Sequence, residues 1–281
     1  MARASSAVRR KRPSAAFTTA AALTLALSLA LSIGVLRAPA MAAQVPVTAG
    51  TPPLDTSAAP RGFHVSAGGL HPGQFLYQTV LERDASTTPL GSRTVSTTLM
   101  TYGGAPVWLM LETRTGAGIP ATDSLIADSA SLQPIHWNST VGQARLGIEF
   151  RGDTAFGATT APAGRRSIVA AMPAGTIVSP AMLETVLRLV PLQPGWHDST
   201  TTLSVLLGAT ALLPTQLSVI GEDRVQVPAG SFDCWVVSVR AASAHGLYWV
   251  TKSDPIVVRS AVDVPSLGGA EMVSALTSIV R

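Results

Sequence analysis

The sequence of 281 residues has one cysteine, few charged residues and almost no lysine, and each shortage excludes a class of protein. Because Cys234 has no second cysteine to pair with, no intramolecular disulfide can hold the fold together, and no CxxC metal motif exists. Only 13% of the residues are charged while 47% are hydrophobic, which argues against a disordered chain. Lys252 is the only lysine beyond Lys11, so the sequence lacks the dense basic stripes of nucleic-acid-binding proteins.

The net charge of +4 comes from the N-terminus rather than from the body of the chain. Six of the twenty basic residues lie in the first 42 positions, which contain no acidic residue. The remaining sequence has fourteen basic residues against sixteen acidic ones, a net charge of −2. We therefore expect no nucleic-acid partner.

The N-terminal residues follow the order of a secretory signal peptide. A basic run at residues 9–12 precedes an uncharged apolar stretch over residues 15–36, and Ala40-Met41-Ala42 matches the A-x-A cleavage pattern. We predict a signal peptide over residues 1–42, cleavage after Ala42 or Ala43, and export to the periplasm or the extracellular space. The alternative is a permanent anchor, since about 20 apolar residues can span a bilayer. An uncleaved segment of this kind would be the expected membrane contact.

The rest of the chain divides into a lead-in and one domain. Residues 43–69 are rich in Pro, Ala, Thr and Gly without periodicity, which predicts a flexible lead-in. Over residues 70–281, short β-rich runs such as 92–102 and 216–227 alternate with turn residues. Many closely spaced strands without alternating helices indicate a mainly β fold, a single antiparallel domain of about a dozen strands.

One segment is predicted to be helical. Ser179 supplies an N-cap hydroxyl and Pro180 a first-turn proline, and apolar residues then recur at helical spacing to residue 190. Glu184 and Arg188 take other positions on this amphipathic helix. Its apolar stripe must be buried, either in an ordinary core or as the plug or lid of a curved sheet.

The clearest local signal is a hairpin at Pro228-Ala229-Gly230. Pro228 fixes φ for the second position of a type I turn, and Gly230 can adopt the left-handed conformation that follows. The next strand contains Cys234, which we interpret as a buried side chain rather than a reactive thiol.

Residues 227–233, together with Trp249 and the turn into residues 256–259, resemble an exported bacterial family, the domain-of-unknown-function family 3108. That family is related in fold to the periplasmic lipoprotein-carrier (LolA/LolB-like) half-barrel superfamily. The resemblance covers roughly residues 73–281. It implies an open, unclosed antiparallel β-barrel wrapped around one or more helices in the cell envelope, and it implies no catalytic residues.

The motifs of common enzymes and metal sites are missing. No two histidines have the i, i+4 spacing of helical metal ligands, and the sequence lacks G-x-S-x-G, Walker and dinucleotide-binding glycine patterns. We therefore predict no catalytic residues, no metal site and no cofactor. The adjacent His197 and Asp198 could act only in a site assembled from distant residues.

The aromatic residues are the candidates for a ligand cavity. If they lie on the concave face of a curved sheet, they would line a cavity suited to acyl chains or another apolar ligand, and otherwise they fill the core. The candidates are Phe75, Tyr77, Trp108, Trp137, Trp235 and Trp249.

Three hypotheses follow for the function. The first is non-enzymatic binding or carriage of a lipid or other lipophilic ligand in the cell envelope. The second is a structural or protein-interaction module that contacts an envelope protein, with a barrel filled by its own side chains and an apolar patch exposed. The third is a hydrolase with a dispersed site around a histidine such as His197.

Overall fold

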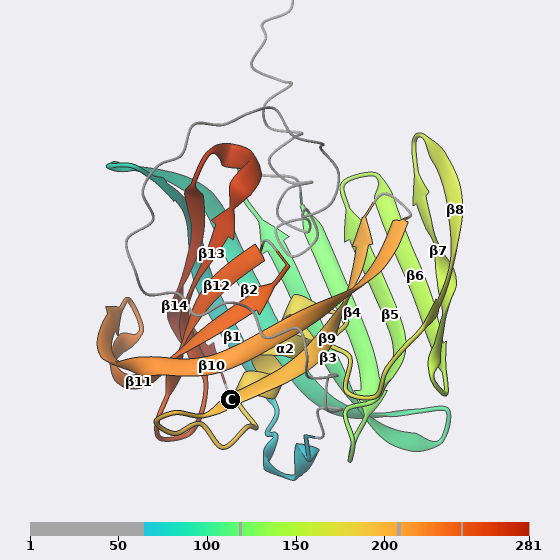
Figure 1. Ribbon diagram of the computed structural model, residues 1–281, viewed down its shortest axis with the longest axis horizontal. Coiled ribbons are helices and arrows are strands. Elements are labelled where there is room, and N and C mark those ends of the chain that lie inside the picture. The colour runs from blue at the N-terminus through green and yellow to red at the C-terminus, as the bar shows by residue number, and fades with distance from the viewer. Residues whose placement is uncertain (1–64, 118–119, 207–208, 243, 281) are drawn as a thin grey trace, which may run out of the picture.

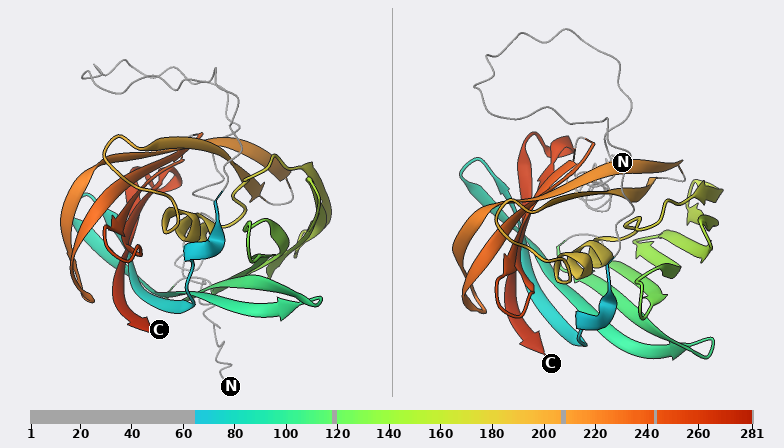
Figure 2. Two further views of the ribbon diagram at one scale, coloured as in Figure 1. Left: turned by 90° about the horizontal axis from the view of Figure 1, so that it is seen from below. Right: turned by 60° about the horizontal axis from the view of Figure 1, so that its bottom comes forward.

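The chain folds into one antiparallel β-sheet that curls around helix α2 (Pro180–Leu187), as Figures 1 and 2 show. The computed structural model describes residues 65–117, 120–206, 209–242 and 244–280, and these contain fourteen strands. The strands before α2 are β1 (Gly73–Arg83), β2 (Ser86–Tyr102), β3 (Ala105–Thr115), β4 (Ala121–Asp128), β5 (Pro134–Val141), β6 (Ala144–Arg151), β7 (Thr154–Ala161) and β8 (Gly164–Ala171). Those after it are β9 (His197–Leu206), β10 (Ala209–Val227), β11 (Gly230–Ala241), β12 (Ala244–Thr251), β13 (Val257–Val264) and β14 (Ala270–Val280), and the 3₁₀ helices are η1 (Ala67–Gly69) and η2 (Pro265–Leu267).

The sheet is a long meander with one non-local pairing. Its order is β8-β7-β6-β5-β4-β3-β2-β1-β14-β13-β12-β11-β10-β9. Each strand pairs with the next one in the sequence, except that β8 does not pair with β9, and β1 pairs with β14. That pairing runs from Gln74 opposite Val280 to Glu82 opposite Glu271. Strands β8 and β9 are the two edges, and no ladder joins their described residues. The barrel is therefore open between β8 and β9.

The predicted fold class is confirmed as a mainly β, open antiparallel barrel with a packed helix. The prediction of about a dozen strands is slightly low, and two strands begin earlier than predicted. Strand β2 continues through a bulge at Leu90, next to Pro89, and a proline is tolerated beside such an irregularity. Pro214 lies in a part of β10 that pairs with β9 before the pairing with β11 begins.

Helix α2 lies inside the curled sheet (Figure 2). As predicted, the backbone N–H of Met182 donates to the Ser179 hydroxyl at 3.2 Å, and Pro180 occupies the first turn. Every residue from Ala181 to Leu187 is buried. The single apolar stripe expected from the sequence is thus only part of the packing surface, because the sheet surrounds the helix. Glu184 is buried with the rest and needs a partner of opposite charge.

The hairpin predicted at Pro228-Ala229-Gly230 is present, and Gly230 has the positive φ expected there. Val227 pairs with Gly230, so Pro228 and Ala229 form a two-residue loop, and Gly230 has φ +139°. Cys234 in the following strand is fully buried. Burial raises the pKa of its thiol to about 12, and the charges of Asp223 and Asp233 act in the same direction, so the thiol is protonated at neutral pH.

The end of the predicted flexible lead-in packs against the domain. Residues 67–69 form η1, Ala67 and Leu70 are buried, and the Ala67 N–H donates to the Ala130 carbonyl at 3.0 Å. Residues 1–64, with the predicted signal peptide and most of the lead-in, lie outside the described residues. Among the described helices, none is long and apolar enough to cross a membrane.

Candidate functional site

A cavity of about 270 Å³ lies between one half of the sheet and the segment that enters α2. Strands β3 to β8 form one wall, and Val178, Ser179, Pro180 and β9 form the other. Because β8 and β9 are the two edge strands of the sheet, the cavity lies at the opening of the barrel. Its volume is just below the range of about 300–1,000 Å³ that is usual for small-molecule sites.

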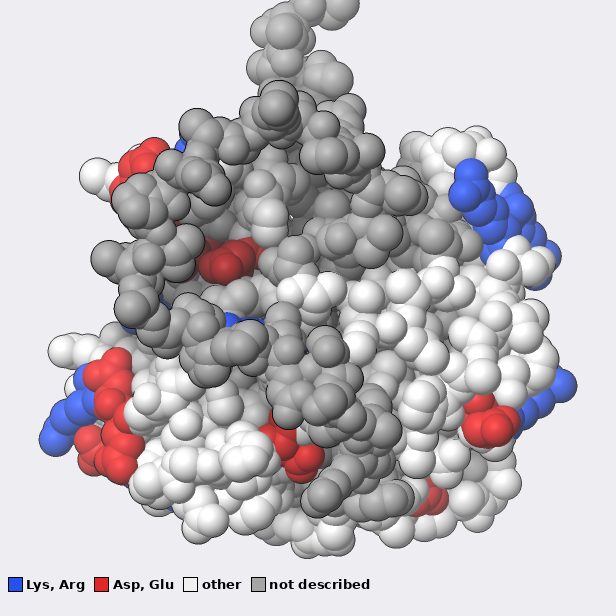
Figure 3. All heavy atoms as spheres, in the orientation of Figure 1, with Lys and Arg blue, Asp and Glu red and all other residues white. Residues whose placement is uncertain are grey.

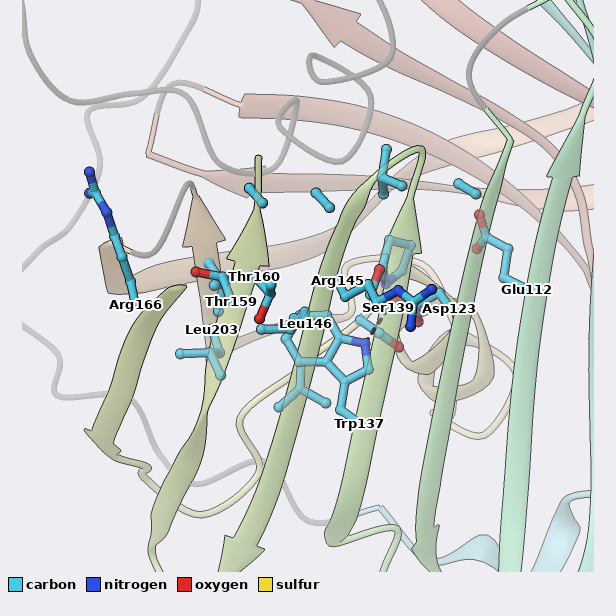
Figure 4. Close-up of a pocket in the computed structure, with 18 of the residues that line it drawn as sticks. Glu112, Asp123, Trp137, Ser139, Arg145, Leu146, Thr159, Thr160, Arg166 and Leu203 are labelled. Atoms are coloured by element: carbon cyan, nitrogen blue, oxygen red, sulfur yellow. Dashed lines mark hydrogen bonds between the residues drawn. The ribbon is translucent and has the colours of Figure 1, made fainter. Parts of the chain in front are cut away.

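Strand register places one row of side chains across this wall. Glu112 of β3 lies opposite Asp123 of β4, which lies opposite Ser139 of β5, and the row ends at Arg166 of β8. Residues directly opposite one another in neighbouring strands face the same side of a sheet. The row therefore runs from an acidic inner end at β3 and β4 to the free edge at β8 (Figure 4).

A cluster of ion pairs closes the inner end. Nη2 of Arg93 donates to Oε2 of Glu112 at 3.0 Å and to Oε1 of Glu184 at 2.7 Å. Nε of Arg114 donates to Oε1 of Glu112 at 2.5 Å. Arg93, Glu112 and Glu184 are all buried, so these contacts join α2 to β2 and β3 in the interior. The Arg93 guanidinium also lies over the Tyr77 ring, 5.1 Å from its centre.

The two buried carboxyl groups of this cluster have pKa values shifted in opposite directions. Burial disfavours the ionised form of Glu112, but Arg114 and Arg93 outweigh it and lower the pKa of Glu112 to about 2. For Glu184 burial is the larger effect, so the pKa of this carboxyl is raised although Arg93 opposes the shift. Glu112 is therefore the firmly ionised anchor of the cluster at neutral pH.

Asp123 lies beside the cluster and uses only one of its oxygens. The indole N–H of Trp137 donates to Oδ2 of Asp123 at 2.8 Å (Figure 4). Oδ1 is buried and accepts no hydrogen bond from any described residue. Burial raises the pKa of Asp123 to about 7, the Glu112 charge adds to the shift, and the Trp137 hydrogen bond and the Arg114 charge oppose it. A carboxyl group perturbed in this way at a cavity wall marks a candidate functional site.

The outer end of the cavity is basic and exposed. Arg145 of β6 and Arg166 of β8 both contribute to the lining and are exposed. Figure 3 shows a generally uncharged surface on the face it draws, with a group of basic side chains at the edge near β8. The cavity thus has a buried acidic end, an apolar middle and an exposed basic rim.

Comparison with known proteins identifies the family. The family model described as protein of unknown function (DUF3108) matches residues 68–273. The chain belongs to the DUF3108 family. No curated protein matches the sequence.

Among solved structures, the DUF3108 chain is similar to a β-barrel-like protein of the domain of unknown function DUF1849 from Brucella abortus. The TM-score is 0.51 at 11% identity, over 75% of this chain and 98% of that one, which shows a shared fold. A protein with a YmcC-like fold from Bacteroides fragilis matches with a TM-score of 0.39 at 11% identity, over 78% of this chain and 100% of that one.

In this DUF3108 domain, Trp137 is the one predicted aromatic that lines the large cavity. Phe75 and Tyr77 instead pack near α2, with the Arg188 guanidinium 4.7 Å from the Phe75 ring and the Tyr77 hydroxyl donating to the Val257 carbonyl at 2.8 Å. Trp108 is buried in the core. Phe75 and Tyr77 border only a small pocket of about 10 Å³, and none of these three side chains lines the large cavity.

The two remaining candidates lie away from the cavity. Trp235 is half-buried, with the Lys252 ammonium 4.4 Å from its ring centre. The Trp249 indole donates to Oδ2 of Asp223 at 3.0 Å, and the Arg259 guanidinium covers its ring at 4.7 Å. Cation–π contacts and a polar partner therefore occupy these rings.

A hydroxyl, a histidine and a carboxylate meet elsewhere in the sheet. Oγ of Ser238 lies 3.2 Å from Nε2 of His245, and Nδ1 of His245 lies 3.5 Å from Oδ2 of Asp263. The order resembles a Ser-His-Asp triad. However, the backbone of Ser238 is paired on both sides, with Ser218 and Leu247, so its amide belongs to the sheet rather than to an oxyanion hole. His197, the histidine singled out from the sequence, instead lies with Nδ1 3.1 Å from the Gly195 carbonyl oxygen.

The polar inner end of the cavity was missed at the sequence level. Glu112 shares its strand face with Met110 and Trp108, and Asp123 shares its face with Leu125. A carboxylate on the apolar side of a predicted strand is the signal that could have identified both residues.

Proposed function

We propose that this protein is a non-enzymatic binding protein for a small lipophilic ligand, which occupies the cavity between β3–β8 and β9. The observation that carries the proposal is a preformed cavity with an apolar middle, including Val141, Leu146 and Leu203, and a few convergent polar groups at one end. This combination is typical of small-molecule sites, where apolar contact supplies affinity and a few polar groups set orientation. Each Å² of apolar surface buried contributes about 25 cal/mol.

The proposed place of action is the bacterial cell envelope, in the periplasm or outside the cell. The basic, apolar and small-residue order of positions 1–42 supports export. The relation in fold to periplasmic lipoprotein-carrier half-barrels, which the resemblance to the DUF3108 family implies, supports a ligand that is itself lipophilic. Fold analogy is a weak guide to function, so the cavity carries the proposal and the resemblance only agrees with it.

An interaction module is the second candidate, and the free edge at β8 favours it. Phe156 of β7 and Val169 of β8 lie directly opposite each other and are 40% and 68% exposed. An unpaired edge strand beside an apolar patch is a surface on which an envelope protein could add a strand. The cavity weighs against this candidate, because a barrel filled by its own side chains would have no such space.

The test measures ligand binding in the native protein, in a variant with a filled cavity and in a variant changed only on the surface. The full chain, with its own N-terminal segment, is expressed, purified gently and extracted for mass spectrometry, and uptake of the apolar fluorophore N-phenyl-1-naphthylamine is then titrated. We expect a stoichiometric apolar species or saturable uptake in the native protein. Leu146→Trp, which adds bulk at the cavity wall, should abolish it, and Val169→Trp on the exposed side of β8 should not. A stable protein that carries no ligand and takes up no probe would overturn the proposal and favour the interaction module.

A further inference from the structure

The inner end of the cavity holds a buried acceptor without a donor. Oδ1 of Asp123 accepts no hydrogen bond from a described residue, whereas Oδ2 is held by the Trp137 indole at 2.8 Å. Buried polar atoms in native proteins are almost always paired, so one that is unpaired at a cavity wall requires an explanation. A ligand that brings its own donor would supply the missing partner.

The surrounding charges restrict the chemistry of that donor. Arg93 and Arg114 face three carboxyl groups, those of Glu112, Glu184 and Asp123, so the fully ionised cluster has one negative charge in excess. A carboxylate or phosphate placed here would add to this excess. An ammonium group would neutralise it, and a hydroxyl or amide N–H would satisfy Oδ1 without adding charge.

Arg166, at the free edge, lies too far away to change this preference. Arg166 is four strands from Asp123 along the row, which corresponds to about 19 Å at a strand spacing of about 4.8 Å. Figure 4 shows Arg166 and Glu112 on opposite sides of the labelled group. Arg145 of β6 is exposed, and its neighbours across the sheet are Thr140 and Thr160. The excess negative charge at the inner end therefore favours a hydrogen-bond donor, and Arg166 is too distant to reverse that preference.

We infer that the ligand is a small amphiphile that enters head first, with a hydroxyl, amide or ammonium group donating to Oδ1 of Asp123. Its apolar tail runs along Leu146 and Leu203 towards the opening between β8 and β9. This inference rests on the proposed function, since it assigns the head group of the same ligand. Fatty acids, which present a carboxylate, are the disfavoured members of the class.

The test uses three ligands with the same tail and different heads. Octylamine, 1-octanol and octanoate are titrated at pH 7.5 into the full-length wild-type protein by isothermal calorimetry. We expect octylamine and 1-octanol to bind more tightly than octanoate. In Asp123→Asn the affinity for octylamine should fall by about ten- to a hundredfold, which is what loss of a hydrogen bond to a charged group implies. Asp233→Asn, which alters a carboxylate whose side chain is 68% exposed, is the matched control and should leave all three affinities unchanged.

The outcomes separate this inference from the proposed function. Tighter binding of octanoate, or equal binding of all three ligands by the wild type, would overturn the head-group assignment while the cavity remained a binding site. Binding of none of them, together with no uptake of the apolar fluorophore, would overturn both. If Asp123→Asn does not fold, the relative affinities of the three ligands for the wild-type protein still decide whether the head-group assignment is correct.

Discussion

Replacing Asp123 by asparagine should stabilise the protein at alkaline pH and have little effect at acidic pH. The pKa of Asp123 is about 7 in the folded protein against 3.8 for an ordinary aspartate. The folded state therefore retains a proton that the unfolded chain releases, and the stability contributed by this group falls as the pH rises from about 4 to about 7. At about 1.4 kcal/mol per pH unit, this shift corresponds to a loss of about 4 kcal/mol. Asparagine cannot ionise and can still accept the Trp137 hydrogen bond, so the variant avoids this loss.

The measurement is urea unfolding of the wild type and Asp123→Asn at pH 5, 6, 7 and 8. The difference in unfolding free energy should be smallest at pH 5 and should grow to about 3–4 kcal/mol in favour of the variant at pH 8. In a domain of this size that corresponds to a rise in Tm of roughly 10 °C. Other titrating groups are common to both proteins and cancel in the difference. Asp233→Asn serves as the control, because its side chain is 68% exposed and a surface substitution should change the unfolding free energy little.

One result would refute the reasoning directly. A stability difference that does not change between pH 5 and pH 8 would mean that Asp123 ionises at an ordinary pKa. The carboxyl group would then be well hydrated or well paired, and the unpartnered Oδ1 would no longer explain the cavity. Addition of octylamine sharpens the test, because a bound ammonium favours the ionised carboxylate and should reduce the advantage of the variant at pH 8.

Two further predictions concern the interior. Arg93→Met should lower the free energy of unfolding by about 3–5 kcal/mol, because it leaves Glu112 and Glu184 buried without their shared partner. Equilibrium urea unfolding measures this change, and an unchanged free energy of unfolding would show that the cluster is hydrated. Cys234 should react with a thiol reagent only as fast as the protein unfolds, because burial raises the pKa of its thiol to about 12. Rapid labelling of the folded protein would contradict its buried position.

The fold was largely predictable because its signals are local. The turn at Pro228 and Gly230 and the cap at Ser179 each depend on a few adjacent residues, and the structure has all of them where they were predicted. The ends of β2 and β10 were not predictable in this way. Pro89 and Pro214 suggest breaks, and only the pairing partners across the sheet show that the strands continue.

The site was harder to predict because the concave face of a sheet is not a local property. Alternation divides each strand into two faces, but the curvature that makes one face concave depends on the pairing of β1 with β14 and on bulges elsewhere. Aromatic side chains were poor guides because they fill space, so most of the candidates complete the core. Many of the side chains that border the empty space are small, such as Ala144 and Ala161, and Trp137 is the one predicted aromatic among them.

The buried ion cluster and the cavity are two results of the same arrangement. Helix α2 fills part of the interior of the barrel, and the contacts of Arg93 with Glu112 and Glu184 fix the helix where the filled part ends. A buried ion pair adds little net stability compared with apolar packing, because the cost of desolvation offsets the attraction between the charges. We expect its value here to be positional, because an entirely apolar contact would not hold the helix at one place along the sheet. On this argument Arg93→Met combined with Glu112→Gln and Glu184→Met could recover stability and still lose the cavity. In this triple variant, the unfolding free energy would then return towards the wild-type value while ligand uptake is lost.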